Sequence, residues 1–207
     1  MKDIACQLYL ISPLDVGGDF PAILEAALSA GPVAAFQFRI KGTAQHEAAA
    51  LAEPLQAICA AHDVAFIVND DVALAKQLKA DGVHMGQGDG EVREARETLG
   101  NDIQIGVTCH NSRHLAMEAA EAGADYVAFG AFYPTTTKDV DHVAELETVV
   151  KWSNVTEIPC VAIGGITPNN AKPLIDAGAD FLAVSSAVWS HPDGPAEAVK
   201  AFNALLA

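Results

Sequence analysis

The sequence contains few basic residues. Only 12 of its 207 residues are Lys or Arg, against 27 that are Asp or Glu, and the formal net charge at pH 7 is −15. Nucleic acid and an anionic membrane surface both require a basic face on the protein, so we expect neither as a partner. Because basic side chains are scarce, each one that follows a predicted strand is a candidate for binding an anionic small molecule.

The sequence also lacks paired cysteines and long apolar runs. No apolar run approaches the roughly 18 residues of a membrane span, and the first residues do not resemble a signal peptide. The four cysteines are widely separated and show no metal-binding spacing: Cys6, Cys59, Cys109 and Cys160. These absences predict a reduced, cytoplasmic protein. Cys109 follows a predicted strand, and we interpret it as a small buried thiol rather than a nucleophile.

Short apolar runs of β character alternate along the chain with alanine-rich segments of helical periodicity. The predicted strands are 8–11, 33–38, 64–68, 82–85, 103–107, 126–129, 160–163 and 181–184. The predicted helices are 46–61, 72–79, 112–122, 143–152 and 169–177. Alternation of this kind favours a parallel sheet, because parallel strands need crossover connections. Eight such units predict an α/β fold with one domain, a single (β/α)8 TIM barrel spanning residues 1–207.

A weak internal repeat supports this count of strands. An Ala-Asp pair follows a helix and precedes a strand in three segments, 79–86, 122–130 and 177–185. The aspartates of these pairs lie at the opposite end of the barrel from the carboxyl ends of the strands, where barrel active sites are found. We therefore predict that they have structural roles: Asp81, Asp125 and Asp180.

The second predicted strand ends in QFRIK, residues 37–41. Alternation along an extended chain places Gln37, Arg39 and Lys41 on one side. In a closed barrel this side faces the mouth, and guanidinium and ammonium groups there form charge-assisted hydrogen bonds with phosphate oxygens. The pattern predicts a site for a polyanion.

Acidic residues follow the third and fourth predicted strands. Asp70 and Asp89 follow neighbouring strands, whose ends lie about 4.8 Å apart, so their carboxylates can converge on one ion. Mg²⁺ takes one or two protein carboxylates and fills its other positions with water and substrate phosphates. The sequence predicts a Mg²⁺ site at Asp70 and Asp89, with an N-cap role for one or both as the alternative. Asp71 directly precedes a helix, and we interpret it as an N-cap.

The remaining strand ends carry hydroxyl groups and glycines. Thr108 and His110 follow the fifth strand, where His110 is equally well interpreted as a general base or as a capping or packing residue. Two glycines begin GGITPNN (164–170) after the seventh strand, and Ser185 and Ser186 follow the eighth. Backbone amides after strands seven and eight commonly hold a phosphate in such barrels. We predict a neutral monophosphate site here, formed by Gly165 with the two serines.

The segment FGAFYPTTTKD (129–139) follows the sixth strand and lies between these two anion sites. Taken alone it fits an anion site or a threonine-rich turn equally well. With the other strand ends in view, we expect Thr135 and Thr137 to orient a substrate. Lys138 would reach toward departing charge, and Thr136 has no assigned role.

Six motifs in this order resemble the thiamine phosphate synthase family. They are QxRxK (37–41), ND (69–70), GVHMGQGD (82–89), GVTCH (106–110), the PTxTKD-like segment (134–139) and AIGGIT (162–167). The resemblance spans nearly the whole chain. It implies a (β/α)8 barrel that joins a hydroxymethylpyrimidine diphosphate to a hydroxyethylthiazole phosphate, with Mg²⁺ assisting a dissociative loss of pyrophosphate.

The resemblance also implies a role for each matching residue. Mg²⁺ would be held by Asp70 and Asp89, and the thiazole phosphate by Thr135, Thr137 and the amides of Gly165, Ser185 and Ser186. Pyrophosphate would be bound, and its departure assisted, by Arg39, Lys41 and Lys138, with Asn69 also binding it. Gln37 and Thr108 would lie along the pyrimidine.

Two alternatives stay open on the sequence. A related thiazole tautomerase would use an acid/base residue such as His110 and would not need the diphosphate-binding set. A non-catalytic paralogue would bind the same phosphates without turnover, a reading supported by Asp71, which stands where family members often carry arginine. Whether the chain forms a homo-oligomer is also open.

Overall fold

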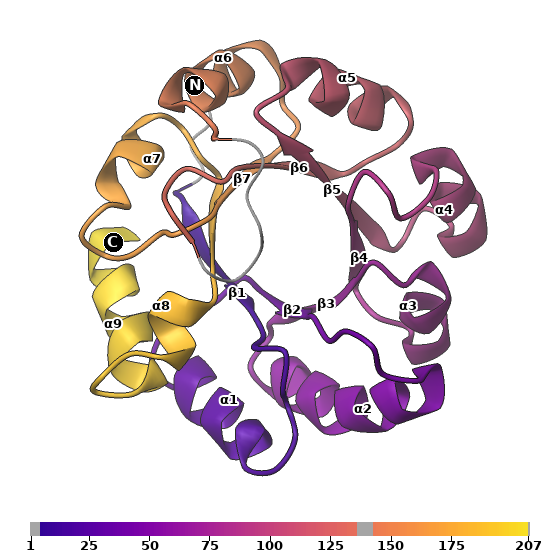
Figure 1. Ribbon diagram of the computed structural model, residues 1–207, viewed down its shortest axis with the longest axis vertical. Helices are drawn as coiled ribbons and strands as arrows, with labels where there is room; N and C mark the ends of the chain where they lie inside the picture. The colour runs from indigo at the N-terminus through magenta and orange to yellow at the C-terminus, as the bar shows by residue number, and fades with distance from the viewer. Residues whose placement is uncertain (1–4, 136–142, 207) are drawn as a thin grey trace.

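The computed structural model describes residues 5–135 and 143–206. Eight parallel strands pair in chain order and close into a barrel, with β1 hydrogen-bonded to both β2 and β8. Figure 1 looks down this barrel and shows the strands as a central ring. The strands are β1 Gln7–Ile11, β2 Ala35–Phe38, β3 Ala65–Asn69, β4 Gly82–Met85, β5 Gln104–His110, β6 Tyr126–Phe129, β7 Cys160–Ile163 and β8 Phe181–Val184.

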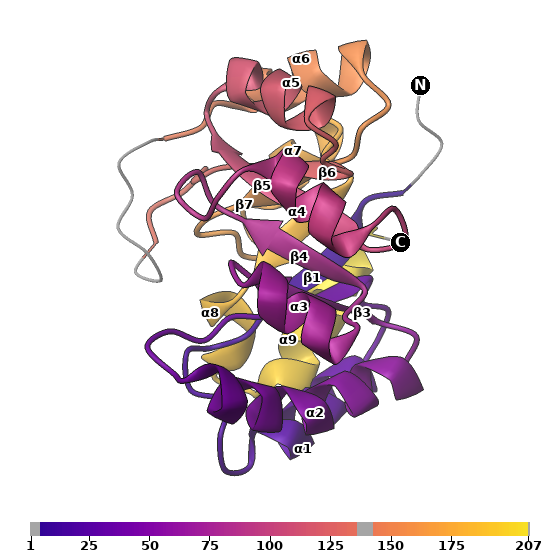
Figure 2. The same ribbon diagram turned by 90° about the vertical axis from the view of Figure 1, so that its right-hand side faces the viewer.

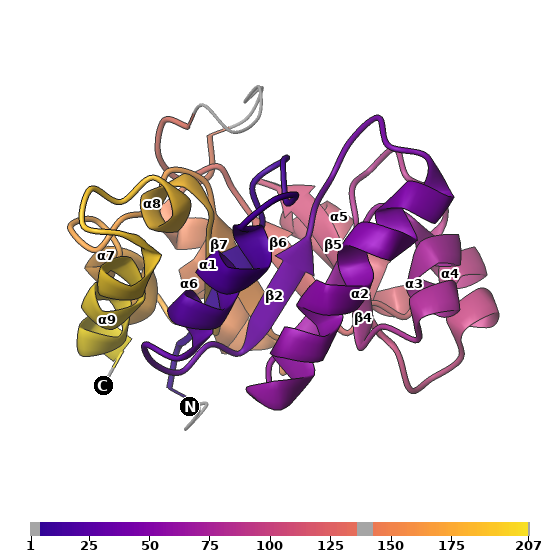
Figure 3. The same ribbon diagram turned by 90° about the horizontal axis from the view of Figure 1, so that it is seen from below.

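The helices form an outer layer around the strands, as the side view in Figure 2 also shows. They are α1 Phe20–Leu28, α2 Gln45–Ala61, α3 Val72–Leu78, α4 Val92–Leu99, α5 Arg113–Glu121, α6 Leu146–Val155, α7 Lys172–Asp176, α8 Ser186–Trp189 and α9 Pro195–Leu206. In Figure 3 the arrowhead of β2 points toward the end of the barrel at which α8 lies. None of the described helices is long and apolar enough to cross a membrane.

The predicted (β/α)8 barrel is confirmed, with differences at some element ends. The structure reproduces the predicted bounds of β4, β6, β7 and β8, whereas β5 continues to His110 instead of ending at Val107. The helix predicted at 143–152 forms at Leu146–Val155. Helices α1, α4, α8 and α9 were not predicted. Helix α4 has only three apolar residues, Val92, Ala95 and Leu99, and the rest of it is polar or charged.

Two layers of buried side chains form the core. The larger layer lies between the strands and the helices and includes Phe36, Phe66 and Trp152. The smaller layer fills the inside of the barrel and includes Tyr9, Ile67, Tyr126 and Val161. Because strand residues alternate between these layers, the same strands that pack against helices also present inward side chains below the mouth of the barrel. These inward side chains form the floor of any site at the mouth.

The three repeated aspartates are structural, as predicted. Each accepts a hydrogen bond at Oδ2 from a backbone N–H at the start of the preceding odd-numbered strand. The donors are Phe66 N to Asp81 at 2.7 Å, Ile105 N to Asp125 at 2.6 Å and Cys160 N to Asp180 at 2.8 Å. Each repeat therefore links two neighbouring strands at their amino-terminal ends: β3 to β4, β5 to β6 and β7 to β8. These links help to fix the register between the paired strands.

Candidate active site

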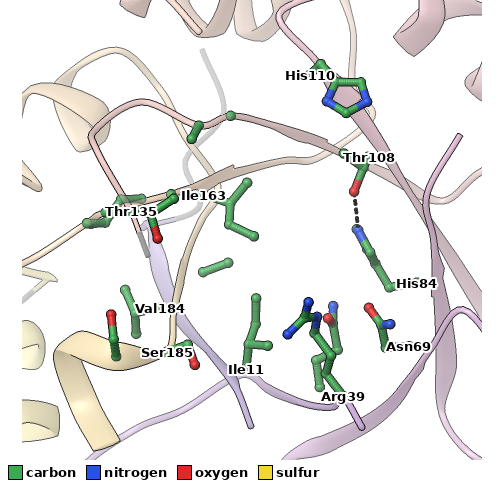
Figure 4. A pocket seen from close by; sticks show the side chains of 18 of the residues that line it. Ile11, Arg39, Asn69, His84, Thr108, His110, Thr135, Ile163, Val184 and Ser185 are labelled. Carbon is green, nitrogen blue, oxygen red and sulfur yellow. Dashed lines mark hydrogen bonds between the residues drawn. The ribbon is translucent and has the colours of Figure 1, made fainter. Parts of the chain in front are cut away.

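A pocket of about 420 Å³ opens at the carboxyl ends of the strands. Figure 4 shows Arg39, Asn69 and His84 on one side of it and Thr135 and Ser185 on the other. The two sides come from opposite halves of the barrel, because β2 to β4 supply the first group and the segments after β6 and β8 supply the second. The pocket can therefore contact two different parts of a ligand, or two ligands, at once.

Arg39 is held at the pocket by Ser12, which no sequence motif singled out. The fully buried hydroxyl of Ser12, which follows β1, accepts a hydrogen bond from Arg39 N at 2.9 Å and donates one to Arg39 O at 3.1 Å. Among the described residues, Nη1 of Arg39 is the one buried side-chain polar atom without a hydrogen-bond partner. A buried guanidinium N–H without an acceptor is costly, so this atom is suited to bind an anion.

Asp70 and Asp89 come together, as the sequence predicted. The two carboxyl groups are close enough to share a hydrogen bond. Burial, and secondly the neighbouring Asp89, raise the pKa of Asp70 to about 6, while Lys41 and Asn69 act in the opposite direction. Asp89 itself is exposed, and its Oδ2 accepts a hydrogen bond from Gly86 N at 2.7 Å. In this pair Asp89 is held by the backbone of its own segment, whereas Asp70 is half-buried.

This carboxylate pair fits a Mg²⁺ ion by the chemistry of its donors. The adjacent Asp89 raises the proton affinity of Asp70, and a hard cation between the two carboxylates would remove that repulsion. Among the described residues, no group of three or more His, Cys, Asp or Glu side chains is arranged to hold a metal. Two carboxylates leave most of the six positions around Mg²⁺ to water and substrate oxygens, which is the usual arrangement at phosphate-binding sites.

Asp71 is not part of this pair. Its Oδ1 accepts a hydrogen bond from Leu74 N at 2.8 Å and caps the N-terminus of α3, which confirms the predicted N-cap. Lys41 is exposed and does not line the pocket, although it lies near enough to Asp70 to affect its pKa. Lys41 therefore belongs to the rim on the side of the carboxylate pair.

Thr108 and His110 are strand residues, because β5 extends to His110 with an irregularity in its pairing to β6 between these two positions. Both line the pocket. The backbone of His110 has a positive φ of 52°. Gln87, in the segment after β4, donates from Nε2 to the carbonyl oxygen of Thr108 at 2.6 Å. This bond ties the segment that carries Asp89 to the end of β5.

The opposite side of the pocket is formed by glycines and hydroxyl groups. Gly165, Thr135, Ser185 and Ser186 all line it. At Gly165 a Cβ atom would lie 2.4 Å from the carbonyl oxygen of Pro134, so only glycine allows the segment after β7 to pack this closely against the segment after β6. The structure thus brings together the residues predicted to bind a monophosphate. Thr137 and Lys138 lie outside the described residues.

Besides Ser12, three inward-facing residues near the site were not predicted: Tyr9, His84 and Tyr126. Each lies in a strand between core residues, and period-two alternation alone would have pointed it into the barrel. His84 stands between Val83 and Met85, which are buried in the outer core. The signal in the sequence that could have identified these three residues is a polar or aromatic side chain at a strand position that faces the inside of the barrel.

The closed barrel and the pocket at the carboxyl ends of its strands define a (β/α)8-barrel enzyme. More narrowly, the chain belongs to the thiamine monophosphate synthase family, whose model matches residues 8–188. The family suggested by the sequence motifs is confirmed, and the chain is accordingly a transferase.

The relatives cover nearly the full chain. The thiamine-phosphate synthase of Erythrobacter litoralis is 68% identical over 99% of this chain and 97% of its own length. That of Hyphomonas neptunium is 53% identical over 97% of this chain and 93% of its own. The solved structure of thiamine phosphate pyrophosphorylase from Pyrococcus furiosus superposes with a TM-score of 0.86 at 32% identity, covering 97% of this chain and 95% of that one.

Proposed function

We propose that the chain joins 4-amino-2-methyl-5-hydroxymethylpyrimidine diphosphate to 4-methyl-5-(2-hydroxyethyl)thiazole phosphate, giving thiamine phosphate and pyrophosphate. The observation that carries the proposal is the buried, unpaired Nη1 atom of Arg39 at a pocket that also has a neutral side of glycine and serine. A diphosphate oxygen would supply the acceptor that Nη1 lacks. The neutral side would receive the second, singly phosphorylated substrate.

The diphosphate is bound by Arg39 together with Asn69 and Lys41. Arg39 and Asn69 line the pocket, and Lys41 approaches from the rim near Asp70. We also assign Lys138 to this group on the family pattern. Positive charge placed where the leaving group gathers negative charge lowers the barrier to its departure.

The thiazole phosphate is bound on the opposite side. Its phosphate accepts hydrogen bonds from backbone amides of Gly165, Ser185 and Ser186, and hydroxyls of Thr135 and Thr137 orient it. An arrangement of amides and hydroxyls suits a monophosphate that stays in place during the reaction. Strong cationic binding on this side is unnecessary, because the thiazole phosphate does not leave and no further negative charge gathers on it.

The reaction breaks one bond and forms one. The C–O bond between the pyrimidine methylene and the diphosphate breaks, and the diphosphate keeps the electron pair. The thiazole nitrogen then donates its lone pair to the methylene carbon, and the new C–N bond leaves a positive thiazolium ring. Neither the bond cleavage nor the bond formation transfers a proton, so the reaction does not require a general base. His110 therefore has no role as a base.

Asp70 and Asp89 would hold Mg²⁺, whose chemical contribution is to neutralise charge on the departing diphosphate. The four free, buried cysteines accord with a reducing compartment, and we propose the cytoplasm as the location.

The direct test is an assay of the purified protein with both substrates and Mg²⁺, in which thiamine phosphate and pyrophosphate are quantified by chromatography. We expect both products in equal amounts, and no products when a chelator removes the metal. Turnover of a thiazole carboxylate phosphate without condensation would instead identify a tautomerase. Binding of both substrates without any turnover would identify a paralogue that has lost catalysis.

The metal assignment is tested with Asp89→Ala and Asp89→Asn. Both variants should lose Mg²⁺-dependent binding of the pyrimidine diphosphate, measured by calorimetry. Asp89→Asn keeps an oxygen that can accept the hydrogen bond from Gly86 N, so it separates loss of the metal from loss of loop structure. Asp102→Ala removes an exposed carboxylate elsewhere and is the matched control. Unchanged Mg²⁺ dependence in Asp89→Asn would refute the assignment.

A further inference from the structure

A row of hydrogen-bonded side chains crosses the inside of the barrel below the pocket. Gln37 Nε2 donates to Tyr9 OH at 2.9 Å, and Tyr9 OH lies 3.0 Å from Tyr126 OH. Tyr126 OH lies 3.1 Å from His84 Nδ1, and His84 Nε2 lies 2.9 Å from Thr108 Oγ1. The last of these bonds is drawn in Figure 4. Five different strands contribute to the row, and it ends at the pocket on both sides.

With Gln37 Nε2 as the first donor, one direction satisfies every bond in this row. Tyr9 OH accepts from the Gln37 amide, and in this direction its own hydrogen is donated to Tyr126. Tyr126 then donates to Nδ1 of His84, which places the imidazole proton on Nε2, where it is donated to Thr108. As a result Gln37 presents its carbonyl oxygen to the pocket as an acceptor. Thr108 retains a hydroxyl hydrogen to donate.

We propose that Tyr9, Tyr126 and His84 are positioning residues that set the hydrogen-bonding direction of Gln37 and Thr108, so that the pocket recognises the amino group and a ring nitrogen of the aminopyrimidine. An amino group donates and a ring nitrogen accepts, which complements an acceptor at Gln37 and a donor at Thr108. The inference rests on the proposed function, because it concerns how that function's pyrimidine substrate is recognised.

The construction of the barrel supports a role beyond filling space. Barrel interiors are usually filled by branched apolar side chains, and a buried hydroxyl is costly unless it is hydrogen-bonded. Room for the Tyr126 ring exists only because residue 106 is glycine, since a Cβ there would lie 1.9 Å from Cζ of the ring. Burial raises the pKa of Tyr9 to about 12 and that of Tyr126 well above its ordinary value, so both hydroxyls keep the hydrogens that the row requires.

The test uses Tyr126→Phe, which keeps the ring and removes the hydroxyl in the middle of the row. We expect the KM for the pyrimidine diphosphate to rise about tenfold, the worth of one buried neutral hydrogen bond, with the KM for the thiazole phosphate unchanged. Tyr133→Phe is the matched control, because its hydroxyl donates to Asn170 O at 2.7 Å outside the row. The control should leave the KM for the pyrimidine diphosphate unchanged.

A substrate analogue separates positioning from packing. Replacing the ring amino group by methyl should lower kcat/KM in the wild type, and this penalty should shrink about tenfold in Tyr126→Phe. Tyr9→Phe should have the same effect, and the double variant should be no worse than either, because each change breaks the same row. Equal loss of kcat/KM for the substrate and its analogue in these variants would overturn the proposal.

The tautomer of His84 is an independent readout. Nitrogen-15 NMR of the wild-type protein should show His84 with its proton on Nε2, and Tyr126→Phe should shift the population toward Nδ1–H. A wild-type proton on Nδ1 would reverse the direction of the row and overturn the proposal. If instead the wild type makes no thiamine phosphate, the proposed function fails, while the tautomer still reports whether the row has the inferred direction.

Discussion

Gly106→Ala is the substitution for which the structure gives the sharpest expectation. Gly106 pairs with Tyr126 across β5 and β6. A Cβ atom at residue 106 would lie 1.9 Å from Cζ, 2.3 Å from Cε2 and 2.4 Å from the hydroxyl oxygen of Tyr126. Carbon atoms do not approach this closely, so the tyrosine ring must leave its place inside the barrel.

The expected cost follows from what the ring loses when it moves. Overpacking a closed core costs about 1–3 kcal/mol. The displaced hydroxyl also loses its bonds to Tyr9 and His84, each worth about 1 kcal/mol. We therefore expect Gly106→Ala to reduce the free energy of unfolding by about 3–5 kcal/mol, a large part of the stability of a typical domain.

Urea unfolding followed by the fluorescence of Trp152 and Trp189 measures this loss. Tyr126→Ala provides the decisive background, because it removes the ring and leaves space for the new methyl group. In the Tyr126→Ala background, Gly106→Ala should reduce the free energy of unfolding by less than about 1 kcal/mol. Gly88→Ala is the control for adding a methyl group to a glycine, since a Cβ there meets no atom within 4 Å.

Two results would refute this reasoning. A loss below about 1 kcal/mol in the wild-type background would show that the barrel accommodates both groups. An equal loss in both backgrounds would show that the cost comes from the strand itself rather than from the ring.

Two further predictions concern stability. Arg96→Met should reduce the free energy of unfolding in urea by about 2–3 kcal/mol, because Arg96 donates to three backbone carbonyls and pairs with the half-buried Asp125. The control is Arg93→Met, at an exposed position on the same helix, which should cost less than about 0.5 kcal/mol. Equal losses in the two variants would contradict a stabilising role for the Arg96 bonds. Burial raises the pKa of the Cys59 and Cys109 thiols to about 12, so the unfolded chain loses these protons first as pH rises above 9. Stability should be retained below pH 9 and fall above it by up to about 1.4 kcal/mol per pH unit for each thiol, measured as the urea midpoint, and a flat profile from pH 8 to 10 would exclude the shift.

The sequence was most informative where short apolar runs are bounded by clear signals. The strands β6 and β8 follow an Ala-Asp pair and end at a glycine or serine, and their bounds were predicted correctly. Helix α6 was misplaced by three residues because Val143, which begins the apolar pattern, is exposed and precedes the helix. Helix α8 has four residues, which is too short for periodicity to detect.

The alternation of strands and helices by itself determined the parallel barrel, and most of the residues selected after its strands line the pocket at its mouth. These features are local, because the period of a strand and its polar terminus are written in consecutive residues. Only the closed structure decided that Asp70 meets Asp89 while Asp71 turns away to cap a helix. It alone joined Tyr9 to Tyr126, which are 117 residues apart in the chain. Barrel closure and strand register bring such residues together, and neither is encoded within a single segment.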